Sequence, residues 1–586
     1  MSKWSFYTTN ELKPKGWLLR QLEIQAEGLC GNLDKVWPDI AQSAWIGGDR
    51  EGWERVPYWL DGFIPLAYLL ENDDMVKRAK KYIDTIIAAQ QDDGWICPCP
   101  DSERENYDSW AVLLITKVLT VYYDCSKDER VPDVIYRVLK NYYTLLSAGK
   151  IRLFEWAKYR WYEGFLAINF TYERYKEGWL LELAEILKEQ GADYNQFVQL
   201  WQRPLNYWRQ KTHIVNIAMM LKHEAVSFKL LGQQYTDNAE YLHDILQKYN
   251  STAVEVFTGD ECLSGLSPIQ GTELCAVVEQ MYSYELLYAI TGQDKWAERL
   301  EGIAFNALPA AVSDDMWAHQ YDQMSNQISC QRFPGKPIFS TNGREAHLFG
   351  LEPNYGCCTA NFGQGWPKLA LSAFMHSGNT VISCIGIPAE LITDDKHIIL
   401  ETNYPFENSF KYSIEAKKGF TFAVRIPSFA ENVMVNGKRA EGGHLEFDIA
   451  AGSVQEIDIC FDTSPRFEKR PYGLNTVKYG SLVFSVPIKY EKKKYEYEKD
   501  GVIRKYPSCD YEYLPLSDWS YGFADKTLVP EKRPLSSIPF SSENPRPLTS
   551  VTWLTIMKQA GSMAWASFSS LGSWRLEMML SSTCSG

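Results

Sequence analysis

The spacing of apolar residues divides the chain into two regions. Up to about residue 375, apolar side chains recur three and four positions apart, which is typical of helices. The clearest helical segments span residues 56–72, 73–91, 109–124, 179–190, 213–232 and 273–292. Paired helices over this length are too numerous for a simple bundle and lack the fixed period of a solenoid. We therefore expect an (α/α)6 barrel in residues 1–375.

After residue 375 the pattern changes to short alternating runs that are typical of strands. These runs span residues 380–388, 397–405, 410–428, 432–449 and 454–462, and residues 435–438 contain an Asn-Gly hairpin turn. We expect a β-sandwich over residues 376–462 and a second one over residues 463–547. The tail, residues 548–586, follows neither pattern and is expected to contribute little to an active site. The predicted fold class is thus multidomain α+β, with a helical barrel followed by β-sandwiches.

Composition and charge narrow the functional classes. The chain has 586 residues, 45% of them hydrophobic and 23% charged, which is typical of a soluble globular protein with several domains. The formal net charge of -14 argues against a nucleic-acid partner. No apolar run is long enough to cross a bilayer and no signal peptide is visible, so we expect no membrane partner and a cytoplasmic location. A homodimer is the assembly to be tested.

The cysteines do not form the pattern of a disulfide framework. The 13 cysteines are scattered singly except for the Cys97–Cys99 and Cys357–Cys358 pairs, so most should be reduced thiols. The prolines around the first pair indicate a rigid structural turn. We expect the following lone cysteines to be small buried apolar residues: Cys30, Cys125, Cys384, Cys460 and Cys509.

A candidate metal site combines two segments of the chain. Thr272 is a candidate N-cap, which would place Glu273 and Cys275 in a first helical turn that favours a carboxylate and a thiolate. Together with the adjacent Cys357 and Cys358 they make a set of one carboxylate and three thiolates, which suits tetrahedral zinc. The spacing is not that of a standard zinc motif, and buried thiols remain the alternative.

The aromatic content points to carbohydrate. The chain has 20 tryptophans, and aromatic rings in the funnel of a helical barrel can pack against sugar rings while polar groups hold hydroxyls. Three residues are candidates for such contacts, although each of them can equally serve packing: His213, Tyr321 and Trp110. Asp61, inside the apolar run YWLDGF, is a fourth candidate because a carboxylate in such surroundings needs a partner or a ligand.

Three segments carry a resemblance to a known family. The chain reads WERVPYWLDGFIPLAYLL, TGDECLSGLSPIQGTELCAVVEQMYSYE and NYGCCTANFGQGWPK, and over residues 53–523 it resembles glycoside hydrolase family 127, the β-L-arabinofuranosidases. The resemblance implies a barrel with β-sandwiches and a zinc ion held by Glu273, Cys275, Cys357 and Cys358. It further implies retaining hydrolysis with Cys357 as nucleophile and Glu261 as general acid/base. The loop after Glu261 differs in length from that of the best-known members.

The implied chemistry is consistent with these residues. A retaining glycosidase uses one group as nucleophile and one as acid and then base, and here a thiolate replaces one of the two carboxylates. Glu261 must carry a proton when the substrate binds, which burial or the charge of its neighbour Asp260 would favour; alternatively, Asp260 is solvated.

Three functional classes follow from the sequence. The first is an exo-glycosidase that acts on terminal β-L-arabinofuranosides or a related plant-derived L-sugar. The second is a barrel-fold isomerase or lyase for a sugar acid, in which Glu261 is a general base and the cysteines form a structural metal site. The third is a carbohydrate-binding protein with a structural zinc ion.

Overall fold

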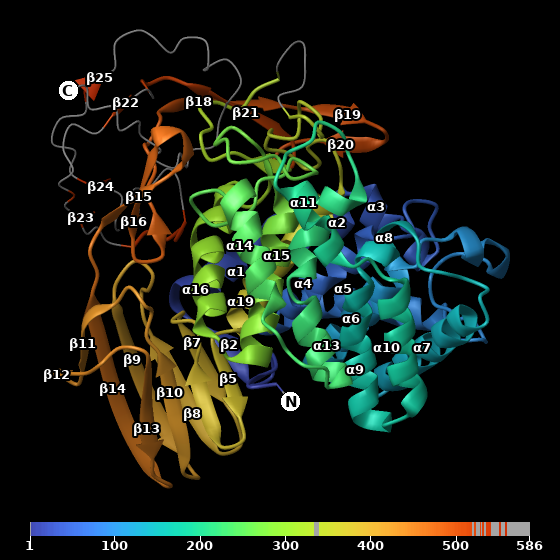
Figure 1. The fold of residues 1–586 in the computed structure, drawn as a ribbon, viewed down its shortest axis with the longest axis horizontal. Coiled ribbons are helices and arrows are strands. Elements are labelled where there is room, and N and C mark those ends of the chain that lie inside the picture. Colours follow the sequence, from blue (N-terminus) through green and yellow to red (C-terminus); the bar gives the residue numbers. More distant parts are fainter. Residues whose placement is uncertain are drawn as a thin grey trace.

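The protein is described by a computed structural model that covers residues 2–332 and 339–518, with short pieces between residues 521 and 558. Its helices of more than five residues are α1 (Gly16–Glu27), α2 (Leu29–Val36), α4 (Arg55–Leu69), α5 (Asp73–Ala88), α6 (Trp110–Ser126), α7 (Val131–Ser147), α9 (Gly164–Tyr175), α10 (Gly178–Gln190), α12 (Ile214–Met220), α13 (His223–Leu231), α14 (Asn238–Asn250), α15 (Leu274–Thr291), α16 (Asp294–Gly302) and α19 (Gly365–Leu371). Shorter helices are α3 (Pro38–Ala41), α8 (Glu155–Tyr159), α11 (Val198–Trp201), α17 (Leu308–Ala310) and α18 (Cys357–Asn361). The helices precede most of the strands along the chain, as the spacing of apolar residues predicts (Figure 1).

Six inner helices close a ring. Each contacts the next in the order α4, α6, α9, α13, α15 and α19, and α19 returns to α4. Outer helices lie against this ring, among them α5 on α4, α7 on α6, α10 on α9, α14 on α13, α16 on α15 and α1 on α19. The predicted (α/α)6 barrel is therefore confirmed.

Three helices of the inner ring are more fully buried than the outer helices. Helices α4, α6 and α15 are buried around most of their circumference, as expected of helices that are apolar on all sides. Helices α5 and α7 bury one face and expose the other. The segment 213–232, which the apolar spacing predicts as one helix, is divided into α12 and α13.

A two-layered β-sandwich follows the barrel. One sheet has the order β1 (Ser5–Phe6), β5 (Phe374–Ser377), β6 (Thr380–Ser383), β10 (Phe420–Arg425) and β13 (His444–Ile449). The other has the order β12 (Lys438–Arg439), β11 (Glu431–Val435), β14 (Ser453–Asp462), β9 (Ser409–Ala416), β8 (Lys396–Glu401), β7 (Ala389–Ile392) and β2 (Leu12–Pro14). The sheets meet where the Tyr412 hydroxyl donates to Ser383 Oγ at 3.0 Å and the Tyr412 and Phe422 rings lie 5.0 Å apart.

The N-terminal segment belongs to both sheets of the sandwich. Strand β1 pairs with β5, and β2 pairs with β7, more than 350 residues further along the chain. The sequence pattern groups these first residues with the helical region, because the partner strands are too distant in sequence for periodicity to indicate the pairing. Barrel and sandwich share one continuous apolar core.

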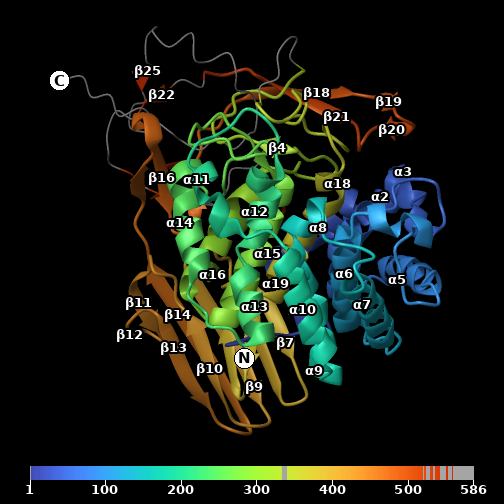
Figure 2. The same ribbon diagram turned by 45° about the vertical axis from the view of Figure 1, so that its right-hand side comes forward.

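The strands that follow the sandwich form smaller sheets, and those within residues 490–515 lie at the end of the barrel away from the sandwich (Figure 2). Strands β15 (Arg466–Lys469), β16 (Asn475–Tyr479) and β17 (Leu482–Val483) form one sheet, β18 (Tyr490–Tyr495) pairs with β21 (Asp510–Pro515), and β19 (Tyr497–Lys499) pairs with β20 (Val502–Arg504). Tyr511 and Tyr513 of β21 form isolated bridges to Phe349 and Cys330 of the barrel loops. A second sandwich over residues 463–547 stays a prediction, and nearly all of the tail after residue 547 lies outside the described residues.

Four of the five lone cysteines that were predicted to be buried apolar residues are buried. Cys30, Cys125, Cys384 and Cys509 are buried as expected, but Cys460 is exposed. Strand β14 alternates between core and solvent, and Cys460 shares the solvent face with Asp458. None of the helices in the described ranges combines the length and the apolar character needed to cross a membrane.

Candidate active site

The four candidate metal ligands come together at the start of two barrel helices. Thr272 and Glu273 form strand β3 (Thr272–Glu273), which pairs with β4 (Asp322–Gln323). Glu273 is itself the N-cap residue of α15, so the prediction of Thr272 as N-cap is wrong by one position. Cys275 lies in the first turn of α15, and Cys357 and Cys358 open α18.

The ligand atoms of these four side chains lie within 4.8 Å of one another. Glu273 Oε1 is 3.7 Å from Cys357 Sγ and 3.8 Å from Cys358 Sγ. Separations of this size match the edges of a tetrahedron whose ligands bind a zinc ion at about 2.0–2.3 Å. Glu273 Oε2 is buried and, within the described chain, accepts no hydrogen bond. The four residues therefore fit a metal ion.

Cys357 differs from the other thiols of the cluster in its electrostatics. Burial opposes its ionisation, yet hydrogen bonds from the Cys275 and Cys358 thiols and the charge of Arg55 hold the pKa of Cys357 well below its usual value. Burial raises the pKa of Cys275 and of Cys358 well above theirs. Cys357 is also partly exposed, whereas the other two are buried. Cys357 is thus the accessible thiol that ionises most readily.

Glu261 reaches the same place from the loop before α15. Its Oε1 accepts a hydrogen bond from the Tyr321 hydroxyl at 2.7 Å, and that hydroxyl lies 3.2 Å from Cys357 Sγ. The two distances together place Glu261 Oε1 and Cys357 Sγ at most 5.9 Å apart. This upper limit is compatible with the spacing of about 5–5.5 Å between the two carboxyl groups of retaining glycosidases. His213 Nε2 lies 3.1 Å from the other oxygen, Oε2.

Asp260, the neighbour of Glu261, is buried and anchors the loop. Its side chain accepts hydrogen bonds from Ser264 Oγ and from the backbone N–H of Thr341 at 2.8 Å. It is therefore not solvated. Burial, together with the charges of Asp260 and Glu261, raises the pKa of Asp322 well above its usual value.

These groups face a cavity of about 300 Å³. Its lining consists of Trp53, Glu54, Tyr58, Trp156, Arg160, Trp208, His213, Val215, Glu261, Glu273, Cys275, Tyr321, Thr341, Asn354, Tyr355 and Cys357. The volume suits a ligand about the size of one sugar ring. Aromatic rings and charged groups dominate the lining, which fits the amphipathic surface of a carbohydrate.

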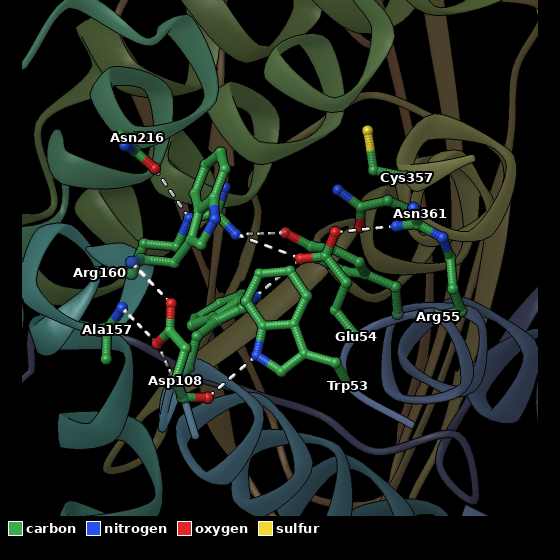
Figure 3. Close-up of polar contacts among 12 residues, drawn as sticks. Trp53, Glu54, Arg55, Asp108, Ala157, Arg160, Asn216, Cys357 and Asn361 are labelled. Carbon is green, nitrogen blue, oxygen red and sulfur yellow. Dashed lines mark hydrogen bonds and ion pairs between the residues drawn. The ribbon is translucent and has the colours of Figure 1, made fainter. Parts of the chain in front are cut away.

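A buried network of hydrogen bonds and charges at the cavity wall was not predicted from the sequence. Glu54 accepts hydrogen bonds from Trp110 Nε1 at 3.0 Å and Arg55 at 2.9 Å, and Arg160 lies 3.6 Å away (Figure 3). Burial raises the pKa of Glu54 to about 7 against the opposing charges of Arg55 and Arg160. Arg160 also donates to Asn216 at 2.8 Å. The available signal was the charged pair Glu54–Arg55 at the start of a helix whose only other charged residue is Asp61.

The predicted sugar-contacting residues divide into two pairs. His213 and Tyr321 line the cavity. Trp110 does not line the cavity. It is fully buried, and its indole N–H donates to Glu54. Asp61 is also outside the lining and is held in the barrel interior by Lys117 at 3.0 Å and Lys368 at 2.6 Å. Asp61 therefore has protein partners rather than a ligand.

Comparison with known proteins identifies the family. Residues 45–370, more than half of the chain, match the family model described as β-L-arabinofuranosidase, GH127 catalytic domain. The chain belongs to the GH127 family. The resemblance seen in the sequence is thereby confirmed, and every cavity-lining residue lies inside the matched range. A comparison with curated protein sequences finds no match.

Solved structures extend the GH127 likeness beyond the barrel. A GH127 β-L-arabinofuranosidase from Geobacillus stearothermophilus T6 has a TM-score of 0.62 and 13% identity, with 88% of this chain and 97% of that chain covered. A second GH127 β-arabinofuranosidase has a TM-score of 0.62 and 14% identity, with coverages of 87% and 95%. A structure described as a glycoside hydrolase has a TM-score of 0.65 and 13% identity, with coverages of 88% and 95%. At these identities the likeness shows the shared fold.

Proposed function

We propose that this GH127 glycoside hydrolase is a retaining exo-glycosidase that removes terminal β-L-arabinofuranosyl groups or a related plant-derived L-sugar. Cys357 is the nucleophile and Glu261 the general acid/base. The observation that carries the proposal is the Tyr321 hydroxyl, which contacts both Glu261 Oε1 and Cys357 Sγ in a cavity for about one sugar ring. The two groups lie at most 5.9 Å apart, which is compatible with a double displacement.

The first step forms a glycosyl-cysteine. Glu261 gives its proton to the glycosidic oxygen while Cys357 Sγ attacks the anomeric carbon, so that the C–S bond forms as the C–O bond breaks. In the second step Glu261 takes a proton from water, the water oxygen attacks the anomeric carbon, and the sulfur leaves as thiolate. Two inversions at one carbon retain its configuration. The Tyr321 hydroxyl holds Glu261 and Cys357 in position relative to each other.

Glu273, Cys275, Cys357 and Cys358 are proposed to hold a zinc ion. Bound there, zinc would keep the Cys357 sulfur deprotonated and stabilise it as a leaving group in the second step. Cys358 is buried and receives the backbone N–H of Cys275 at 3.3 Å, which suits a residue that anchors a metal rather than one that reacts.

The terminal sugar is recognised by polar groups around the cavity. His213, Tyr321, Glu54 and Arg160 offer donors and acceptors for its hydroxyls, and the small cavity favours a chain end over an internal residue. The proposed binding partner is a carbohydrate substrate. A cytoplasmic location and a homodimer stay predictions. Two alternatives were a sugar-acid isomerase or lyase and a carbohydrate-binding protein. No observation favours either of them over the glycosidase.

The proposal is tested with p-nitrophenyl β-L-arabinofuranoside and reduced, zinc-supplemented enzyme. Turnover is expected for the β-anomer, and proton NMR of the first product formed should show the β-configuration. Cys357→Ser is expected to lose turnover by several orders of magnitude. An inverted first product, or an unchanged rate in Cys357→Ser, would contradict the assignment of a cysteine nucleophile.

A further inference from the structure

Two exposed aromatic rings border the mouth of the cavity. Trp208 is 43% exposed and Tyr355 is 51% exposed, although both belong to the cavity lining. Exposed aromatic rings that adjoin a cavity lined by polar groups are typical of ligand contacts. The two rings are therefore candidates for a second binding position outside the cavity.

Neither ring is loosely attached. The Trp208 ring lies 5.8 Å from the ring of Trp156 and 5.9 Å from that of His213. The guanidinium of Arg55 lies over the Tyr355 ring, 4.6 Å from the ring centroid. These neighbours, of which His213 and Arg55 are buried, hold each ring in a defined orientation, which reduces the entropy lost when a ligand binds.

The position of Trp208 relative to Glu261 determines which part of a bound substrate the Trp208 ring faces. Trp208 Nε1 donates to Glu261 Oε2 at 3.3 Å, whereas Glu261 Oε1 faces Tyr321 and, through it, Cys357. Under the proposed function, Glu261 protonates the glycosidic oxygen, so the terminal sugar lies on the Cys357 side. The leaving group then extends past Glu261 toward the exposed Trp208.

We propose that Trp208 and Tyr355, the exposed rings of the cavity lining, form a binding subsite for a second sugar ring, the leaving group of the reaction. The inference rests on the proposed function and adds the class of substrate. The indole face packs against the C–H face of that ring, so the enzyme prefers di- and oligosaccharides over glycosides of small alcohols. Tryptophan is suited to this role because it offers a large rigid surface with few rotatable bonds.

The test compares methyl β-L-arabinofuranoside with a β-L-arabinofuranosyl disaccharide. Wild-type enzyme should cleave the disaccharide with the higher kcat/KM. In Trp208→Ala the ratio of the two kcat/KM values should fall about tenfold, in line with the energy of an aromatic contact. Trp208→Phe should keep most of the ratio. Any effect on Glu261 through the lost indole N–H is shared by both substrates and cancels in the ratio.

Tyr241→Ala serves as the matched control, because Tyr241 is 56% exposed on α14 and lies outside the cavity lining. Its ratio should equal that of the wild type. An unchanged ratio in Trp208→Ala, or an equal loss on both substrates, would overturn the sugar subsite and leave the proposed function intact. Wild-type enzyme that cleaves neither glycoside would overturn the proposed function, and this inference with it.

Discussion

The Tyr321 hydroxyl lies 3.2 Å from Cys357 Sγ. The same hydroxyl donates to Glu261 Oε1 at 2.7 Å, so one phenol connects the two groups that are proposed to react. Tyr321 is buried, and its backbone carbonyl accepts the N–H of Leu274 at the start of α15. The site is therefore tied to the barrel helix that carries Glu273 and Cys275.

Tyr321→Phe is expected to lower kcat by about 10–100-fold, because the hydroxyl that orients the acid and the nucleophile is removed. Zinc content and melting temperature should change little, since the ring remains. Tyr412→Phe in the sandwich removes a hydroxyl that is also buried and hydrogen-bonded, to Ser383, and should leave kcat unchanged. Equal kcat losses in the two variants would argue against a role of Tyr321 in the site.

Replacing Cys357 and replacing Cys358 are expected to impair the enzyme in different ways. Cys357→Ala should keep much of its zinc and its substrate affinity but lose turnover by several orders of magnitude. Cys358→Ala should lose metal first, and activity as a consequence. Zinc per chain, measured by elemental analysis, separates the two outcomes, and Cys384→Ala serves as the control for a buried thiol in the sandwich. A zinc-free Cys357→Ala beside a zinc-replete Cys358→Ala would reverse the assignment.

Glu261→Gln is expected to separate the two steps of the reaction. A nitrophenyl leaving group departs without a proton, so the first turnover should still release nitrophenol in a burst. Later turnovers should be slow because no base activates water. A methyl glycoside, which needs the acid, should be cleaved more than about a hundredfold more slowly than by the wild type. Steady release without a burst, at the wild-type rate, would speak against Glu261 as acid/base.

A buried charge cluster on the inner barrel helices should matter for stability. Lys368 Nζ donates to Asp61 Oδ2 at 2.6 Å and to Gln364 Oε1 at 2.7 Å, and Lys117 is the second cation on Asp61. Lys368→Met leaves Asp61 with one cation and should cost about 3 kcal/mol, read as a lower urea midpoint. Lys81→Met on the exposed face of α5 should shift the midpoint little. Matching shifts in the two variants would contradict the prediction.

Glu285 should make stability depend on pH. Burial raises its pKa to about 8, against the opposing charges of Lys368 and Lys117. The folded chain therefore keeps this proton to a higher pH than the unfolded chain, and the stability contribution of Glu285 falls as pH rises from about 4.5 to about 8. Glu285→Gln has no proton to lose, so its melting temperature relative to wild type should rise over that range. Glu456→Gln on the exposed side of β14 should show no such trend.

The sequence determined the order of the architecture and which four residues are candidate metal ligands. Apolar spacing of three and four residues predicted the helices of the barrel, and alternation predicted the strands of the sandwich. Glu273 and Cys275 form one local motif and Cys357 and Cys358 another, and the family resemblance joined the two motifs into one candidate site. Such features depend on residues a few positions apart, whose spacing is set directly by the period of a helix or strand.

The tertiary structure decided which of the other polar residues meet the cavity. Glu54, Arg160 and Trp208 reach it from separate segments, while Asp61, equally conspicuous in the sequence, pairs with lysines of other inner helices instead. The pairing of β1 and β2 with distant strands likewise has no local signal. Whether a side chain faces a ligand or a protein partner depends on how several helices pack together, and the spacing within any one helix does not contain that information.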